Sequence, residues 1–64
     1  MRTGEAIKKA RESKGMTQKE LADKLYVDPS LVCRWEKGQR GVSLAQFSVI
    51  LDVFGMTRAD IERM

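Results

Sequence analysis

The chain has 64 residues, of which 42% are hydrophobic, with one Cys, no His and a formal net charge of +3. This length limits the chain to one domain, a lone Cys excludes an intrachain disulfide, and the lack of His leaves no cluster of metal ligands. No apolar run approaches the roughly 18 residues that span a bilayer. We therefore expect a cytoplasmic protein without metal, cofactor, small-molecule ligand or membrane partner, whose core depends on apolar packing alone.

The first two helices are predicted from their ends. Thr3 is expected to cap a helix that Gly15 terminates, with an inward face formed by Ala6, Ile7 and Ala10. Residues 17–20, Thr-Gln-Lys-Glu, form a capping box, in which the Thr and Glu side chains each accept a backbone N–H. A second helix should begin there, and its apolar spacing is given by Leu21, Ala22 and Leu25.

A third helix is predicted to begin at Asp28-Pro29, because Asp is a strong N-cap and Pro is tolerated at the first helical position. Val32 and Trp35 lie three residues apart and should face inward together. We therefore expect Trp35 in the core, not stacked on a base. Gly38 can end this helix, and residues 39–42 are predicted as a loop.

The last part of the chain contains a second capping box and a longer helix. Residues 43–46, Ser-Leu-Ala-Gln, should start this helix and Gly55 should end it. Its predicted apolar stripe consists of Leu44, Phe47, Ile50, Leu51 and Phe54. A short final helix starts within residues 57–60 and carries Ile61. Five short helices with tight connections predict an all-α fold, a compact orthogonal bundle in one domain over residues 1–64.

Residues 18–37 are the most informative stretch, because only three residues separate two short helices there. So short a turn forces the helices to cross steeply. The angle between them should be filled by Leu21, Leu25, Val27, Val32 and Trp35, with the small Ala22 at the closest approach. The outer face of the second of these helices is then left exposed, and it carries Ser30, Leu31, Cys33, Arg34 and Lys37.

Three segments of the chain resemble the Cro/repressor-type helix-turn-helix family of phage and bacterial regulators. They are AIKKARESKGMTQKELADKL, VDPSLVCRWEKG and SLAQFSVILDVFGM. The resemblance covers about residues 4–61, and the combination R-x-x-x-G-M-T-Q-x-E-L-A with W-E-x-G is specific. It implies a lambda-repressor-like DNA-binding domain, whose helix-turn-helix unit over residues 18–37 places the recognition helix in the major groove of double-stranded DNA. Basic residues agree with this, since residues 1–40 hold ten Lys or Arg against six Asp or Glu.

The resemblance also implies roles for individual residues. Positions that touch base edges in the family correspond here to Pro29, Ser30 and Arg34, and Arg34 is the best base reader because its guanidinium can bond O6 and N7 of guanine. Positions that contact backbone phosphates correspond to Gln18, Lys37, Gln39 and Arg40. A structural ion pair between the first helix and the end of the recognition helix corresponds to Arg11 and Glu36.

Three positions differ from the family pattern. Tyr26 lies in the turn where relatives have Gly with a positive φ, and this conformation costs Tyr roughly 1–2 kcal/mol more than Gly. We expect Tyr26 to keep the left-handed conformation, the alternative being a remodelled turn. Pro29 offers no side-chain donor, so base reading should depend more on Ser30 and Arg34. Cys33, where relatives often have Ser, is expected to be an ordinary surface residue and not a redox switch.

Val49 and Val53 lie four residues apart and off the apolar stripe of their helix. With Met56 and Met64 they are predicted to form an exposed apolar patch, which suggests a partner surface. Relatives bind two-fold symmetric operators as dimers through C-terminal elements. The resemblance therefore implies a weak homodimer that uses Val49, Val53, Met56 and the last helix, and the alternative is that this surface packs back on its own domain.

The predicted function is a sequence-specific DNA-binding transcriptional regulator, a repressor that occludes promoter DNA as a dimer. The alternative is an antitoxin or adaptor that uses the same fold to bind a protein partner. An enzyme is not expected, because the chain has no His, no Gly-rich phosphate loop and no carboxylate pair that so small a domain could enclose. The end of the chain after a short helix fits either a whole regulator or the first domain of a longer one.

Overall fold

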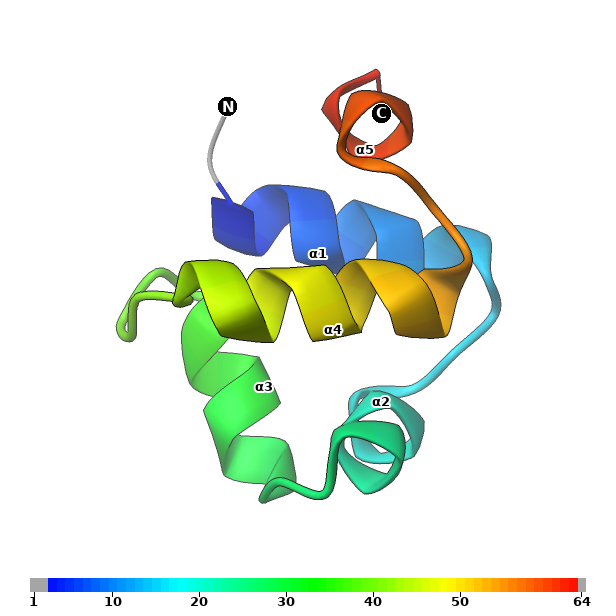
Figure 1. The fold of residues 1–64 in the computed structure, drawn as a ribbon. Coiled ribbons are helices and arrows are strands. Elements are labelled where there is room, and N and C mark those ends of the chain that lie inside the picture. Colours follow the sequence, from blue (N-terminus) through cyan, green and yellow to red (C-terminus); the bar gives the residue numbers. More distant parts are fainter. Residues whose placement is uncertain (1–2, 64) are drawn as a thin grey trace.

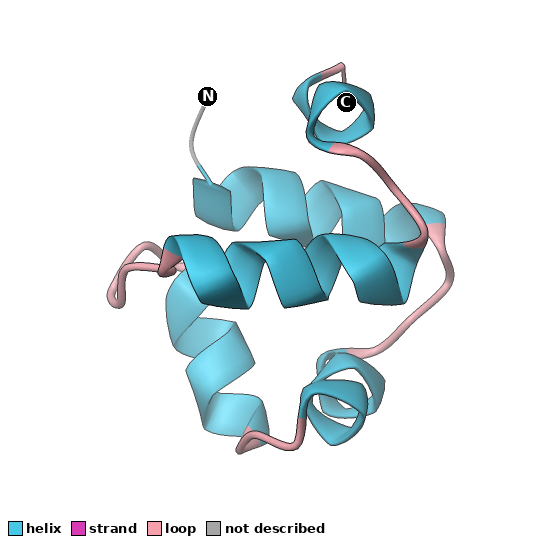
Figure 2. Cartoon of the chain, in the orientation of Figure 1, coloured by secondary structure: helices cyan, strands magenta, loops and turns pink. Residues whose placement is uncertain are grey.

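The computed structural model describes residues 3–63, and within this range it contains five helices and no strand (Figures 1 and 2). The helices are α1 (Thr3–Ser13), α2 (Gln18–Leu25), α3 (Pro29–Glu36), α4 (Leu44–Phe54) and α5 (Arg58–Glu62). Helices α1 and α4 lie side by side, with α5 on one side of them and the α2–α3 pair on the other (Figure 1). The all-α orthogonal bundle of five short helices is thus confirmed.

Side-chain caps fix most of the helix starts. The hydroxyl of Thr17 accepts the backbone N–H of Glu20 at 3.0 Å, and Glu20 returns the contact by accepting the N–H of Thr17 at 3.0 Å. The same reciprocal pair forms between Ser43 and Gln46 at the start of α4, and a third one, which the sequence analysis did not identify, forms at Thr57. The expected cap at Thr3 is wrong, because this residue already belongs to α1.

Each helix contributes a fully buried apolar side chain to one core, and these are Ile7, Leu21, Val32, Ile50 and Ile61. Leu44 corrects the predicted stripe of α4, since its side chain is 75% exposed. It is the first residue of α4, next to the loop that follows α3. Leu31 is more buried than predicted. It is half-buried and packs against the core instead of lying free on the outer face of α3.

Gly4 marks a close approach that the sequence analysis missed. A Cβ atom at this position would overlap with the backbone carbonyl of Trp35. Only a residue without a side chain therefore lets the first turn of α1 lie against the end of α3. The available signal was a Gly within a helical pattern, which has no turn to explain it.

None of the helices within residues 3–63 is long and apolar enough to cross a membrane.

Candidate nucleic-acid interface

The turn between α2 and α3 is built around Tyr26. Its backbone has φ 58° and ψ 41°, which confirms the left-handed conformation predicted for this position. The N–H groups of Tyr26 and Val27 both return to carbonyls in the last turn of α2, and Asp28 then caps α3 by accepting the N–H of Ser30 at 2.8 Å. The Tyr26 side chain is 95% exposed. The turn is therefore held by these backbone bonds and by the Asp28 side chain, without packing of the aromatic ring.

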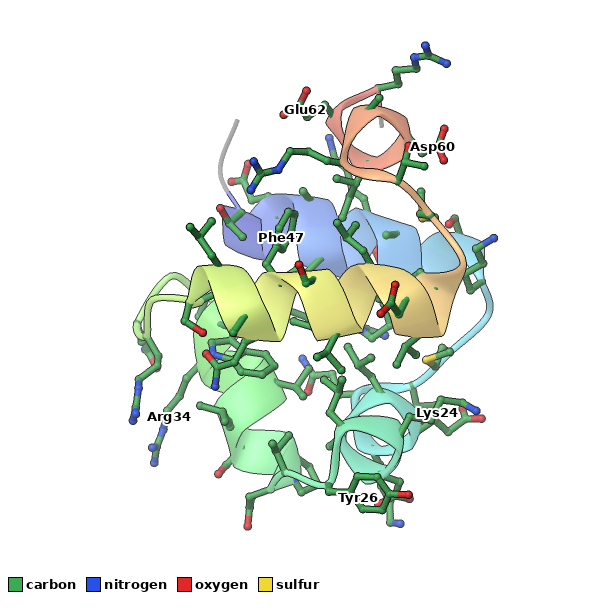
Figure 3. All side chains as sticks on the ribbon, viewed as in Figure 1. Lys24, Tyr26, Arg34, Phe47, Asp60 and Glu62 are labelled. Atoms are coloured by element: carbon green, nitrogen blue, oxygen red, sulfur yellow. The ribbon has the colours of Figure 1, made fainter. Side chains whose placement is uncertain are left out.

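Helix α3 has a buried face and an exposed face. Val32 and Trp35 are buried, whereas Pro29, Ser30 and Arg34 are all exposed. Ser30 and Arg34 lie four residues apart and so share one face of the helix. In Figure 3 the Arg34 side chain extends away from the body of the molecule into solvent. The residues predicted to touch base edges are therefore accessible together, next to a Cys33 side chain that is half-buried.

The loop after α3 folds back on the end of that helix. Gly38 takes a positive φ of 73°, and the N–H groups of Gln39 and Arg40 both reach the carbonyl of Arg34, at 2.9 and 3.3 Å. Lys37, Gln39 and Arg40 are all exposed. The loop thus gathers two cations and an amide beside Arg34, at the C-terminal end of the exposed face of α3.

A buried ion pair holds the helices that carry this surface. Arg11 donates from Nε to Glu36 Oε2 at 2.7 Å and from Nη2 to Glu36 Oε1 at 3.1 Å. The expected ion pair is therefore present, and it is bidentate. Their side chains are only 11% and 3% exposed. The hydrogen bond to Glu36 raises the pKa of the Arg11 guanidinium above its ordinary value, while burial opposes this shift. A third bond, from Arg11 Nη1 to the carbonyl of Met16 at 2.7 Å, attaches the connection before α2.

Gln18 joins the same cluster, which the sequence analysis did not foresee. Its amide Nε2 donates to Glu36 Oε1 at 3.0 Å, and the side chain is half-buried. Because a carboxylate only accepts hydrogen bonds, this contact fixes which way the amide of Gln18 points. Gln18 is also the first residue of α2, where the backbone N–H lacks an intrahelical partner.

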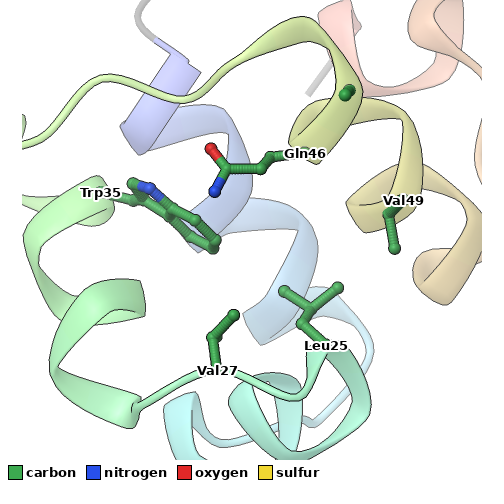
Figure 4. A pocket seen from close by; sticks show the side chains of 6 residues that line it. Leu25, Val27, Trp35, Gln46 and Val49 are labelled. Carbon is green, nitrogen blue, oxygen red and sulfur yellow. The ribbon is translucent and has the colours of Figure 1, made fainter.

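The residues expected at a dimer interface are only partly exposed. Val49 is half exposed, whereas Val53 and Met56 are partly buried and pack against the core. Met64 lies outside the described residues. Val49 instead lines an apolar groove of about 220 Å³ together with Leu25, Val27, Trp35, Ala45 and Gln46 (Figure 4).

Comparison with known protein families identifies one match. The model of a family described as helix-turn-helix matches residues 7–61, a range that includes α2, the turn at Tyr26 and α3. No curated protein and no solved structure gives a significant match. Because the family match covers most of the chain and agrees with the geometry of α2 and α3, the chain belongs to the Cro/C1-type helix-turn-helix family of DNA-binding transcription regulators.

Proposed function

We propose that this regulator is a repressor, which binds a two-fold symmetric operator as a dimer and occludes promoter DNA. The observation that carries the proposal is the exposed face of α3. The Arg34 side chain makes no hydrogen bond or ion pair among residues 3–63, and it lies with Ser30 on one accessible face. A surface guanidinium without a partner is available for the paired acceptors of a guanine in the major groove.

In this proposal the base contacts come from Pro29, Ser30 and Arg34. Arg34 supplies most of the discrimination, Ser30 donates to or accepts from a neighbouring base, and Pro29 makes only apolar contact, for example with a thymine methyl. The backbone contacts come from Gln18, Lys37, Gln39 and Arg40. They set the register of the domain on the duplex, and they make the affinity fall steeply as salt concentration rises.

Selection of binding sites from random DNA tests this function directly, because it reports binding, sequence preference and half-site symmetry together. We expect a two-fold symmetric site whose half-sites lie about one helical turn apart. With that site, Arg34→Ala should cost about 1–3 kcal/mol of binding free energy, and it should cost little on scrambled DNA. The matched control is Arg63→Ala, which removes the same charge just beyond α5. It should weaken binding to the selected site and to scrambled DNA equally and only slightly. Equal losses for Arg34→Ala on both duplexes would show that Arg34 does not read sequence.

The proposed dimer uses Val49, Val53, Met56 and α5. Val49 offers the cleanest test, because half of its side chain is exposed and a change there spares the core. We expect Val49→Lys to shift the sedimentation of the protein at high concentration toward the monomer and to weaken binding to the full operator more than to a half-site. A protein that is monomeric at high concentration, and whose operator affinity is unchanged in Val49→Lys, would rule out this interface.

A further inference from the structure

One face of α4 is centred on Val49. Residues three and four positions before and after a given residue lie on the same side of a helix, and for Val49 they are Gln46, Ala45, Asp52 and Val53. The first three of these are exposed, Val49 is 50% exposed and Val53 is half-buried. Only one of the 11 residues of α4 is charged, although 33% of the chain is. This face therefore has no lysine, arginine or glutamate side chain that would hold another protein surface away.

The residues of this face match one another when two copies of α4 run antiparallel with Val49 against Val49. Ala45 then meets Val53 of the second copy, so that a small and a branched apolar side chain pack together. Gln46 meets Asp52 of the second copy. The amide oxygen of Gln46 already accepts the backbone N–H of the N-cap residue at 3.2 Å, which leaves its Nε2 donors for a carboxylate. The Asp52 side chain is exposed and makes no hydrogen bond or ion pair among residues 3–63.

The apolar groove of about 220 Å³ borders one half of this face. Ala45, Gln46 and Val49 form one wall of the groove, and residues of α2, the turn and α3 form the rest (Figure 4). In the antiparallel pair this half of the face meets Val53 of the second copy. The second copy therefore covers apolar surface that a single chain leaves open to water, which favours association.

The place of α4 in the bundle suits a two-fold symmetric dimer. In Figure 1 α4 lies across the front of the molecule, with α5 at one end and the α2–α3 pair at the other. A two-fold axis along that end-to-end direction, passing beside Val49, turns a second copy front to front and reverses the direction of its α4. Both α2–α3 pairs then lie at the same end of the dimer. Both recognition helices can therefore approach one side of a duplex, as a two-fold symmetric operator requires.

We propose that the partner of this face is a second copy of the chain, and that the dimer forms by antiparallel packing of α4 against α4 about a two-fold axis at Val49. The inference rests on the proposed dimeric repressor and narrows its interface to α4, with α5 away from the centre. Helices of 11 residues are only about 16 Å long. The contact is therefore smaller than the roughly 800 Å² per partner of a stable complex, and the dimer is weak without DNA.

Cysteine cross-linking reads the register of this pair. All variants carry Cys33→Ser, because the chain has one Cys of its own. For helix axes about 8–10 Å apart, the two Cα atoms of residue 49 lie roughly 3–6 Å apart at the two-fold axis, which overlaps the range for a disulfide. We expect Val49→Cys to form a disulfide-linked dimer with oxidised glutathione. The two copies of residue 45 lie about 12 Å apart, so Ala45→Cys, the matched control on the same face, should not cross-link.

Ala59→Cys, at an exposed position of α5, tests an interface formed by that helix instead. The variants are compared by gel electrophoresis without reductant, and DNA binding is measured separately by fluorescence anisotropy. Cross-linking of Val49→Cys alone supports the pairing, and in a protein that binds no DNA it also overturns the proposed function. Faster cross-linking of Ala45→Cys or Ala59→Cys, or none in any variant, overturns the pairing. A two-fold symmetric selected site would then leave the dimeric repressor standing with a different interface.

Gln46→Glu tests the polar contact at the edge of the pair. Glutamate can still accept the N–H of the N-cap residue, but it places a carboxylate opposite Asp52 of the second copy. Like charges that face each other across an interface are unfavourable, so self-association measured by sedimentation equilibrium should weaken at least roughly tenfold. Adding Asp52→Lys should restore it, whereas the control Ala59→Glu should leave it unchanged. Equal weakening by Gln46→Glu and Ala59→Glu, or no rescue by Asp52→Lys, would overturn the contact between Gln46 and Asp52.

Discussion

Arg11→Met is expected to remove most of the stability of this domain. The substitution keeps an apolar stem of similar length but leaves the carboxylate of Glu36, whose side chain is 3% exposed, without its cation. Breaking a buried ion pair by removing one partner costs about 3–5 kcal/mol. A 64-residue domain has a total stability of roughly 3–10 kcal/mol, at about 0.05–0.15 kcal/mol per residue. The variant should therefore be partly unfolded at room temperature or close to it.

The chain contains a matched control for this measurement. Lys19 and Asp23 form an ion pair of 3.0 Å within α2, but their side chains are 75% and 62% exposed. An exposed pair four residues apart on a helix contributes only about 0.3–0.5 kcal/mol. Chemical denaturation followed by the fluorescence of Trp35 gives the free energy of unfolding for Arg11→Met and Lys19→Met. Equal losses in the two variants would refute the argument that burial makes the Arg11–Glu36 pair important.

Three further predictions concern stability. Gly4→Ala should destabilise the domain by about 1–3 kcal/mol or more, the cost of overpacking, because the added methyl group meets the carbonyl of Trp35. A melting temperature equal to that of the wild type would contradict this. Tyr26→Gly should stabilise it by roughly 1 kcal/mol, because a left-handed backbone is relieved and an exposed ring is lost; destabilisation would mean that the ring makes a stabilising contact. Hydrogen bonds from backbone N–H groups lower the pKa values of the capping carboxylates of Asp28 and Asp60 below 3.8. Their contribution to stability is therefore present above this pH and is lost as the pH falls through the lowered pKa values. Acid titrations of Asp28→Asn and Asp60→Asn should show a smaller loss of folding free energy than the wild type.

The parts of the fold that the sequence predicted are those that local chemistry decides. The capping boxes at Thr17 and Ser43 each involve four consecutive residues, and their hydrogen bonds form wherever the helix lies. The left-handed conformation of Tyr26 was predicted in another way, from the resemblance to a family whose members have Gly with a positive φ at this position. For the candidate site, the same local reasoning placed Ser30 and Arg34 on the exposed face of α3.

The parts that the sequence did not predict depend on where whole helices lie. Leu44 matches the apolar stripe of α4 by spacing, yet it is exposed whereas the rest of the stripe is buried. Gly4 and Trp35 are 31 positions apart, and only the crossing of α1 and α3 brings them together. The hydrogen bond from Gln18 to Glu36 likewise spans 18 positions, so no local pattern indicates it.

The division of α3 into two faces has a consequence for how such a regulator changes its target. The core takes Val32 and Trp35 from this helix, and the turn before it is held by backbone contacts and by Asp28. The exposed positions 29, 30 and 34 can therefore be replaced together without repacking the interior. Under the proposed base contacts, a library restricted to these three positions should change the binding preference of the domain while its melting temperature stays nearly constant.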